Sequence, residues 1–266
     1  MSLSLPPDAP DPRDYEYPSR ADLPIRVMPF DGGNPVEIQV GLNTCGGDAA
    51  TTAIEILLGD GVQRSRLFCY FNGRAFTAQD VGSGSIREII KGVQQYGVCP
   101  EFVWPYVAEN VNTKPPVAAY EQAKPVAGQI KTYARCATLG SVKSALADGY
   151  PVVFGFHPNP AIFTASIKAP DFVLPVPLES DLTGHGSHAV AAVGYDDSKQ
   201  AIVCRNSWGK DWGNSGDFML SYGYFAPNPA GGDYLGWAFD PWVMTRQVPP
   251  VKPSLSIFEW VGAWVS

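Results

Sequence analysis

Residues 184–222 read GHGSHAVAAVGYDDSKQAIVCRNSWGKDWGNSGDFMLSY, and this stretch determines how the rest of the chain is interpreted. It holds two short apolar runs, 188–195 and 201–204, separated by the polar residues 196–199. Apolar runs of this length on either side of a polar turn are typical of two antiparallel strands. In such a hairpin the start of the first strand lies beside the end of the second. We therefore expect His188 and Asn206 to be neighbours across a sheet.

A histidine next to an asparagine amide is suited to proton transfer in nucleophilic catalysis. The amide oxygen binds one ring nitrogen, which fixes the tautomer and orients the other nitrogen toward a nucleophile. Trp208 follows Asn206 by two residues, so its ring is expected to cover the His188–Asn206 hydrogen bond and keep water away from it. The nucleophile has to come from another part of the chain.

The histidine and asparagine segments, HAVAAVGYDD at 188–197 and CRNSWGKDWGNSGDFML at 204–220, resemble those of the papain-like (C1) cysteine peptidases. In that family the catalytic cysteine comes first, and the histidine and asparagine follow about 130 to 150 residues later. Cys45 precedes His188 by 143 residues. The resemblance covers roughly residues 10 to 246 and implies that Cys45 is the nucleophile, His188 the base and Asn206 the orienting amide.

Cys45 lies where the sequence predicts the start of a buried helix. Small residues follow it, and an apolar run then leads to a stop at Gly59. The positive end of a helix dipole stabilises a thiolate, which favours a reactive cysteine at this position. Gln39 precedes Cys45 by six residues, the same separation as the oxyanion-hole glutamine of the family. Its side-chain amide and the Cys45 backbone N–H are therefore expected to hold the oxyanion.

The residues that flank Cys45 depart from the family pattern. Gly46 follows the cysteine, where the family usually has tryptophan or another large residue. Asn43 and Thr44 precede it, where glycine with serine or alanine is usual. These departures leave open a catalytically silent binding protein with the same fold.

A rival alignment would place Cys45 at the position of a family disulfide cysteine and Asp48 at the position of the nucleophile. The chain would then be an inactive enzyme. We reject this alignment because it loses the spacing of Gln39 and leaves Leu42 at the oxyanion position.

Residues 82–85, GSGS, resemble the glycine-rich strand with which the family binds the substrate backbone. Only small residues let a peptide approach that closely. Gly82 and Ser83 are therefore expected to contact the substrate. A plain glycine turn before the helix predicted from Ile86 is an equally ordinary interpretation.

Composition limits the classes of partner. The chain has 266 residues, a net charge of −7 and a pI near 4.9, which argues against nucleic acid because phosphate binding needs clustered lysine and arginine. The sequence shows neither an apolar run long enough to span a membrane nor the apolar core of a signal peptide, so we expect a cytoplasmic protein that does not bind membranes.

Five cysteines are an odd number, as one reactive thiol plus four others would give. In the secreted members of the family a disulfide occupies positions that here hold Leu42 and Asp80. The other four cysteines are therefore expected to be buried thiols. Cysteine and histidine spacings do not favour a metal site, and we expect no metal and no cofactor.

The predicted fold class is α+β, because helical patterns come first and strand patterns second. The resemblance implies two lobes, with a helical lobe at about 37–125, an antiparallel β-barrel-like lobe at about 126–246, and the active site in the cleft between them. Residues 1–36 are expected to form an extended N-terminal arm. Residues 247–266 form a C-terminal tail that either packs on the body or contacts another protein.

The function expected from these features is hydrolysis of peptide bonds in peptide or protein substrates. Two alternatives stay open. One is acyl transfer to an amine by the same three residues, as in a transglutaminase. The other is the silent binding protein, which would keep the fold without the chemistry.

Overall fold

The computed structural model describes residues 7–8, 11, 13–28, 35–74, 84–182, 186–226 and 236–246. The predicted substrate contacts Gly82 and Ser83 lie outside these ranges, as does the C-terminal tail 247–266, so what was predicted for them stays a prediction. Within the described ranges, none of the helices has the length and hydropathy needed to cross a membrane.

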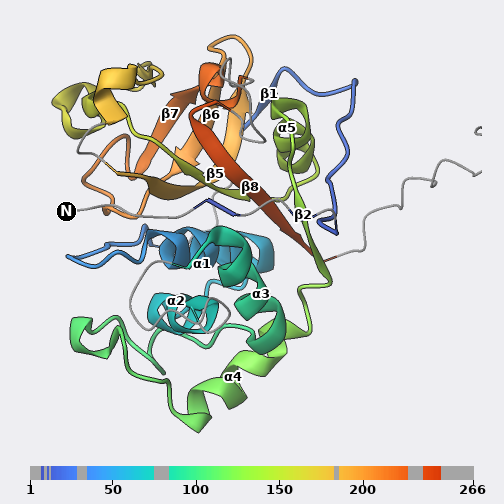
Figure 1. Ribbon diagram of the computed structural model, residues 1–266, viewed down its shortest axis with the longest axis vertical. Helices are drawn as coiled ribbons and strands as arrows, with labels where there is room; N and C mark the ends of the chain where they lie inside the picture. The colour runs from blue at the N-terminus through green and yellow to red at the C-terminus, as the bar shows by residue number, and fades with distance from the viewer. Residues whose placement is uncertain are drawn as a thin grey trace, which may run out of the picture.

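The helices of the first half lie on one side of the molecule, and the sheet lies on the other side together with one later helix (Figure 1). The helices of the first half are α1 (Cys45–Leu58), α2 (Arg66–Arg74), α3 (Ile86–Tyr96) and α4 (Val117–Ala127). The strands follow in the second half, together with α5 (Leu139–Ala147). The α+β class expected from the order of the patterns is therefore confirmed. Short 3-10 turns connect the elements at η1 (Ala108–Asn110), η2 (Pro160–Phe163), η3 (Ala165–Lys168), η4 (Glu179–Leu182) and η5 (Tyr222–Phe225).

Helix α1 is buried between the sheet and the helices α2 and α3 (Figure 1). It begins at Cys45 and ends where Gly59 adopts a positive φ of 61°, a left-handed conformation that glycine takes without a Cβ penalty. Gly47 lets α2 approach closely, because a Cβ there would lie 3.0 Å from the Cβ of Tyr70 and 3.1 Å from the carbonyl oxygen of Arg66. The small residues after Cys45 therefore allow α1 and α2 to pack closely.

The sheet has the strand order β2-β8-β3-β5-β6-β7-β4, and β1 pairs separately with β5. Its neighbours are antiparallel except for the parallel pair of β4 and β7. The sequence analysis expected a barrel-like sheet, whereas the described strands form an open path that ends at β2 and β4. The strands are β1 (Arg26–Val27), β2 (Thr132–Arg135), β3 (Val152–Phe156), β4 (Val173–Leu174), β5 (His188–Asp196), β6 (Ala201–Arg205), β7 (Asp217–Ser221) and β8 (Ala238–Thr245).

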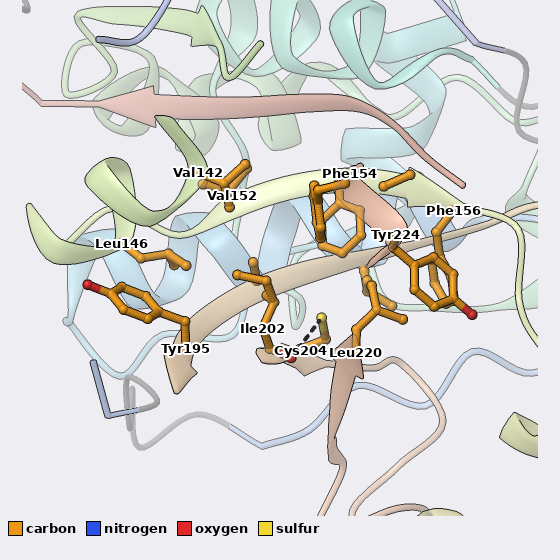
Figure 2. Packing of buried hydrophobic residues seen from close by; sticks show 14 of the residues in the cluster. Val142, Leu146, Val152, Phe154, Phe156, Tyr195, Ile202, Cys204, Leu220 and Tyr224 are labelled. Carbon is orange, nitrogen blue, oxygen red and sulfur yellow. Dashed lines mark hydrogen bonds between the residues drawn. The ribbon is translucent and has the colours of Figure 1, made fainter. Parts of the chain in front are cut away.

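An apolar core fills the sheet face that lies away from α1. Helix α5 places Val142 and Leu146 against it, and β3 contributes Phe154 (Figure 2). Burying an aliphatic or aromatic side chain of this size stabilises the fold by about 1.5–3 kcal/mol. A second core lies between the sheet and the helices, and it includes Cys45 and Ala189. The strand β5 therefore has an apolar core on each face.

Two buried side chains anchor the predicted N-terminal arm to the body. Asp8 is only 2% exposed, and its carboxylate accepts a 2.8 Å hydrogen bond from the indole N–H of Trp242 in β8. Tyr17 is also buried, and its hydroxyl donates to Asp148 at 2.7 Å. Most of the other described residues up to Met28 are exposed or half-buried, so the arm is anchored to the body at these two side chains, and its extent at 1–36 stays a prediction.

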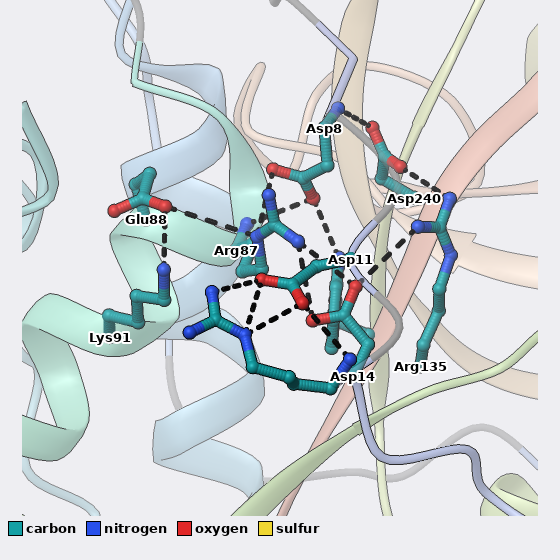
Figure 3. A network of polar contacts seen from close by, with 10 residues as sticks. Asp8, Asp11, Asp14, Arg87, Glu88, Lys91, Arg135 and Asp240 are labelled. Atoms are coloured by element: carbon teal, nitrogen blue, oxygen red, sulfur yellow. Dashed lines mark hydrogen bonds and ion pairs between the residues drawn. The ribbon is translucent and has the colours of Figure 1, made fainter. Parts of the chain in front are cut away.

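A network of charges links this arm to both sides of the molecule (Figure 3). Arg87 of α3 pairs with Asp14 at 3.0 Å, and Arg135 of β2 pairs with Asp240 of β8 at 2.9 Å. The backbone N–H of Asp8 donates to Asp240 at 2.5 Å. The arm thus joins the helical side to the sheet side.

All five cysteines lie in the described residues, and all are buried and free of disulfide bonds. The expectation that the usual disulfide of secreted relatives is missing is confirmed. The cytoplasmic location stays a prediction.

Candidate active site

The hairpin of β5 and β6 brings His188 and Asn206 together as the sequence predicted. His188 is the first residue of β5, and Asn206 directly follows the last residue of β6. The strands pair Ala191 with Arg205, so the start of β5 lies beside the end of β6. The Nε2 atom of His188 lies 2.8 Å from Oδ1 of Asn206, and both residues are buried.

The hydrogen bonds around Asn206 determine the tautomer of His188. The backbone N–H of Ser207 donates to the same Oδ1 at 2.8 Å, which identifies this atom as the amide oxygen. Nε2 must then carry the proton that it shares with Oδ1. Nδ1 of His188 is buried and has no hydrogen-bond partner among the described residues. The imidazole therefore presents a lone pair on Nδ1.

The charge state of His188 agrees with this tautomer. Burial lowers its pKa to about 4, and the hydrogen bond to Asn206 opposes that shift only in part. The imidazole is therefore neutral near pH 7. A neutral ring with a free Nδ1 can accept a proton as a general base.

Aromatic rings enclose the imidazole, and the ring of Trp208 is where the sequence analysis expected it. Trp208 stacks on His188 with ring centroids 5.0 Å apart and an interplanar angle of 29°. Phe156 meets the imidazole edge-on at 5.9 Å. Phe163 in turn stacks on Trp208 at 5.7 Å and is 56% exposed. The His188–Asn206 hydrogen bond is thus shielded, and an apolar ring is presented to solvent beside it.

Cys45 meets the strand that carries His188. It is the first residue of α1, is 2% exposed, and shares a core with Ala189. Burial raises the pKa of its thiol to about 12, although a hydrogen bond from the backbone N–H of Ala189 lowers the pKa in part. The carboxylate of Asp48 raises the pKa further, while the N–H groups at the start of the helix lower it. A neutral thiol and a neutral imidazole therefore lie at the junction of α1 and β5.

Gln39 is held by the loop that follows Asn206. Its backbone N–H donates to the carbonyl of Ser207 at 2.7 Å, and a β-bridge joins Ile38 to Trp208. Its side-chain Oε1 accepts from the hydroxyl of Ser207 at 3.1 Å, and its Nε2 donates to the carbonyl of Leu42 at 2.5 Å. One N–H of the amide is thus used in the loop before Cys45, and the second remains for another acceptor.

The rival alignment gains no support from the position of Asp48. This residue lies one turn inside α1, is fully buried, and faces Arg66 of α2 at 3.7 Å. Cys45 is the residue at the tip of the helix. The geometry therefore favours Cys45 as the nucleophile.

Three features of the site were missed in the sequence. Ser207 orients both Asn206 and Gln39, and its place between Asn206 and Trp208 was the available signal. The N–H of Ala189 carries no signal, because any residue except proline supplies one. Arg66 directly precedes the apolar run of α2, and this charged residue at the start of a buried helix was the available signal. Within the described residues, no group of three or more His, Cys, Asp or Glu side chains could hold a metal ion.

Comparison with known proteins agrees with this geometry. The family described as papain family cysteine protease matches residues 43–226 of this chain. That span contains Cys45, His188 and Asn206, while Gln39 lies just before it.

One curated relative is an uncharacterized peptidase C1-like protein of Acanthamoeba polyphaga mimivirus. It is 34% identical over 199 residues, which is 70% of this chain. The match covers 60% of the length of the viral protein.

Solved structures show the same likeness. Xylellain, a cysteine protease from Xylella fastidiosa, is 28% identical and has a TM-score of 0.75 over 92% of this chain and 96% of xylellain. A cysteine protease of Carica candamarcensis in complex with E-64 is 21% identical, with a TM-score of 0.63 over 85% of this chain and 100% of that one. At that lower identity the likeness shows the fold alone.

Proposed function

This chain belongs to the papain family of cysteine proteases, and on that premise we propose that it hydrolyses peptide bonds with Cys45 as the nucleophile. His188 is the acid and base in this proposal, and Asn206 orients it. The observation that carries the proposal is the 2.8 Å bond from His188 Nε2 to Asn206 Oδ1, which leaves Nδ1 as a proton acceptor. The fold is the papain-like α+β fold that the resemblance implied.

The first chemical step moves a proton from the thiol of Cys45 to Nδ1 of His188. Burial disfavours a lone thiolate and a lone imidazolium, as their shifted pKa values show. One proton transfer makes both charges together, so that each compensates the other. The thiolate then attacks the peptide carbonyl and forms a tetrahedral oxyanion.

The oxyanion is held by two donors, the side-chain amide of Gln39 and the backbone N–H of Cys45. Ser207 and Leu42 support the amide from two sides, which keeps it in one orientation. Each such donor contributes roughly 3 kcal/mol to the stability of the transition state. His188 next protonates the leaving amine, and a water molecule releases the acyl group from Cys45.

Peptides or proteins are the substrates that the family implies. The chain spans about 60% of the length of the viral relative, so the activity and substrates of the whole protein are part of the proposal. Because His188 protonates the leaving amine, the rings of Trp208 and Phe163 lie on the leaving-group side of the scissile bond.

A thiol-directed epoxide probe tests the proposal. Wild-type protein should be labelled at Cys45, identified by peptide mass, and His188→Ala should lose the label. All five cysteines are buried, and the four that have no role in the proposal serve as internal controls in the same spectrum. Peptide hydrolysis with and without an added amine then separates hydrolysis from acyl transfer. Unlabelled wild-type protein that still binds peptides would instead identify a silent binding protein.

A further inference from the structure

Arg66 is a buried arginine that the mechanism above does not use. It begins α2, is 7% exposed, and its guanidinium meets three carboxylates from three segments. The distances are 3.0 Å to Glu37, 3.1 Å to Glu101 and 3.7 Å to Asp48. Its Nη1 also donates to the carbonyl of Ile38 at 3.1 Å. One planar group thus contacts the segment before Gln39 and the helix of Cys45.

The contacts on the Gln39 side are direct. Glu37 and Ile38 are the two residues before Gln39, and Arg66 binds the side chain of the first and the backbone of the second. Gln63 also donates to Glu37 at 3.1 Å. The strand-like segment that presents the Gln39 amide is therefore held from the helical side, opposite the bond to Ser207.

The contacts on the Cys45 side run through two residues. Asp48 lies one turn after Cys45, and Tyr106 lies with its ring 4.1 Å from the guanidinium carbon. The hydroxyl of Tyr106 is 2.8 Å from that of Thr44, the residue directly before Cys45. Arg66 thus contacts a residue of α1 and a residue that binds the start of α1.

We propose that Arg66 is a positioning residue that fixes the distance between the two oxyanion donors, the Gln39 amide and the Cys45 N–H. A guanidinium is planar and presents five N–H donors in a rigid fork, so it can fix several segments in one geometry. This inference rests on the proposed function, because an oxyanion forms only if Cys45 attacks a carbonyl.

The charges of the cluster support this role. Burial raises the pKa of Glu37 to about 8 and that of Asp48 to about 7, and the positive charge of Arg66 opposes both shifts. Burial by itself lowers the pKa of Arg66, but the acidic groups of Glu37, Asp48 and Glu101 more than offset this, so the guanidinium remains charged. A pKa of about 8 leaves Glu37 itself mostly protonated near pH 7. Lysine keeps the charge but carries its three N–H donors on one nitrogen, so it does not reproduce the rigid fork whose Nε, Nη1 and Nη2 meet Glu37, Ile38 and Glu101.

Arg66→Lys tests the proposal by two measurements on the same protein. Hydrolysis of a peptide amide should lose roughly 10²-fold in kcat with little change in KM, as expected when one oxyanion donor is misplaced. Alkylation of Cys45 by iodoacetamide should stay within about threefold of wild type, because alkylation develops no oxyanion. Arg64→Lys is the matched control, since Arg64 is also buried but pairs with Asp60, and its kcat should not change.

The two measurements on Arg66→Lys distinguish a positioning role from general damage. Unchanged kcat in Arg66→Lys overturns the inference, and so does an equal loss of hydrolysis and alkylation, which would indicate general damage. If Arg66→Lys does not fold, Glu101→Ala on the cluster's outer side takes its place, with about tenfold lower kcat and normal alkylation expected. Wild-type protein that neither hydrolyses peptides nor reacts at Cys45 would remove the proposed function itself.

Discussion

The two sides of the candidate active site are built from opposite chemistry. On the sheet side, His188 is neutral, bonded to an amide and enclosed by the rings of Trp208 and Phe156. On the helical side, the start of α1 lies over a buried cluster of Glu37, Asp48 and Arg66. The sheet side thus supplies a proton acceptor without net charge, whereas the helical side supplies a frame built around the charged guanidinium of Arg66 beside the two proposed oxyanion donors.

This difference gives the two sides opposite pH dependence. His188 has a folded pKa of about 4, below its ordinary 6.5, so the unfolded chain takes up a proton first and stability falls as the pH drops from about 6.5 to 4. Glu37 has a folded pKa of about 8, above its ordinary 4.5, so stability falls as the pH rises from about 4.5 to 8. Between these two groups, stability is therefore lost to His188 at lower pH and to Glu37 at higher pH, and the mildly acidic range balances the two losses.

The largest expected effect comes from removing the base on the sheet side. His188→Ala should lower kcat/KM for a peptide substrate by about 10⁴-fold or more, because the thiol loses its proton acceptor. The measurement is the release of a fluorescent leaving group. Tyr195→Phe is the matched control: it lies in the same buried strand and loses a hydrogen bond to Pro24, but its kcat/KM should stay near wild type. Similar losses in both variants would mean that folding, and not chemistry, was disturbed.

Asn206 should matter less than His188. Asn206→Ala removes the orienting amide but leaves the ring, so kcat is expected to fall by roughly 10²-fold with KM nearly unchanged. Asn206→Asp places a carboxylate beside Nε2, which should raise the pKa of His188 above its value of about 4. The pH profile of kcat/KM measures this shift. An unchanged pH profile in Asn206→Asp would argue that the hydrogen bond between His188 and residue 206 does not control the pKa of the catalytic base.

Removing the aromatic cover should have a smaller effect. Trp208→Ala exposes the His188–Asn206 hydrogen bond to water, and we expect kcat to fall by about tenfold because that bond weakens. Trp208→Phe keeps an aromatic face on the imidazole and is expected to recover most of the activity. If Trp208→Phe is as slow as Trp208→Ala, shielding is not the function of this ring.

A last effect is expected in stability, on the helical side. Glu37→Gln removes a buried carboxyl whose pKa is raised, so the fall of the unfolding free energy between pH 5 and 8 should shrink by about 3 kcal/mol. Urea unfolding followed by tryptophan fluorescence at several pH values measures it. Glu109→Gln, an exposed glutamate in η1, is the control and should leave the slope as in wild type. A slope that Glu37→Gln does not alter would contradict the charged frame described above.

Some elements were predictable because their causes are local. The apolar run from 188 and the polar turn at 196–199 predicted the hairpin, and the register of β5 and β6 then brought His188 to Asn206. The small residues after Cys45 and the glycine at 59 predicted α1 with both of its ends. Leu42 and Asp80 stood where paired cysteines would be, so the free thiols could also be foreseen.

Other features depend on contacts between distant segments. The bond between Asp8 and Trp242 spans 234 positions, and no local pattern indicates that an aspartate in a proline-rich arm will be buried. The path of described strands ends at β2 and β4, which do not pair with each other, so the sheet is open where a barrel-like one was expected.

The sequence alone predicted the hairpin and the helix that starts at Cys45, because spacing and residue type carry those signals. The roles of Cys45, His188 and Asn206 in the proposed mechanism followed from the resemblance to papain-like cysteine peptidases. Folding in three dimensions decided the tautomer of His188, the supports of Gln39 and the charged cluster around Arg66. These depend on hydrogen bonds, burial and ion pairs between side chains that only packing brings within reach, and a buried charge has its pKa set by neighbours that are remote in sequence.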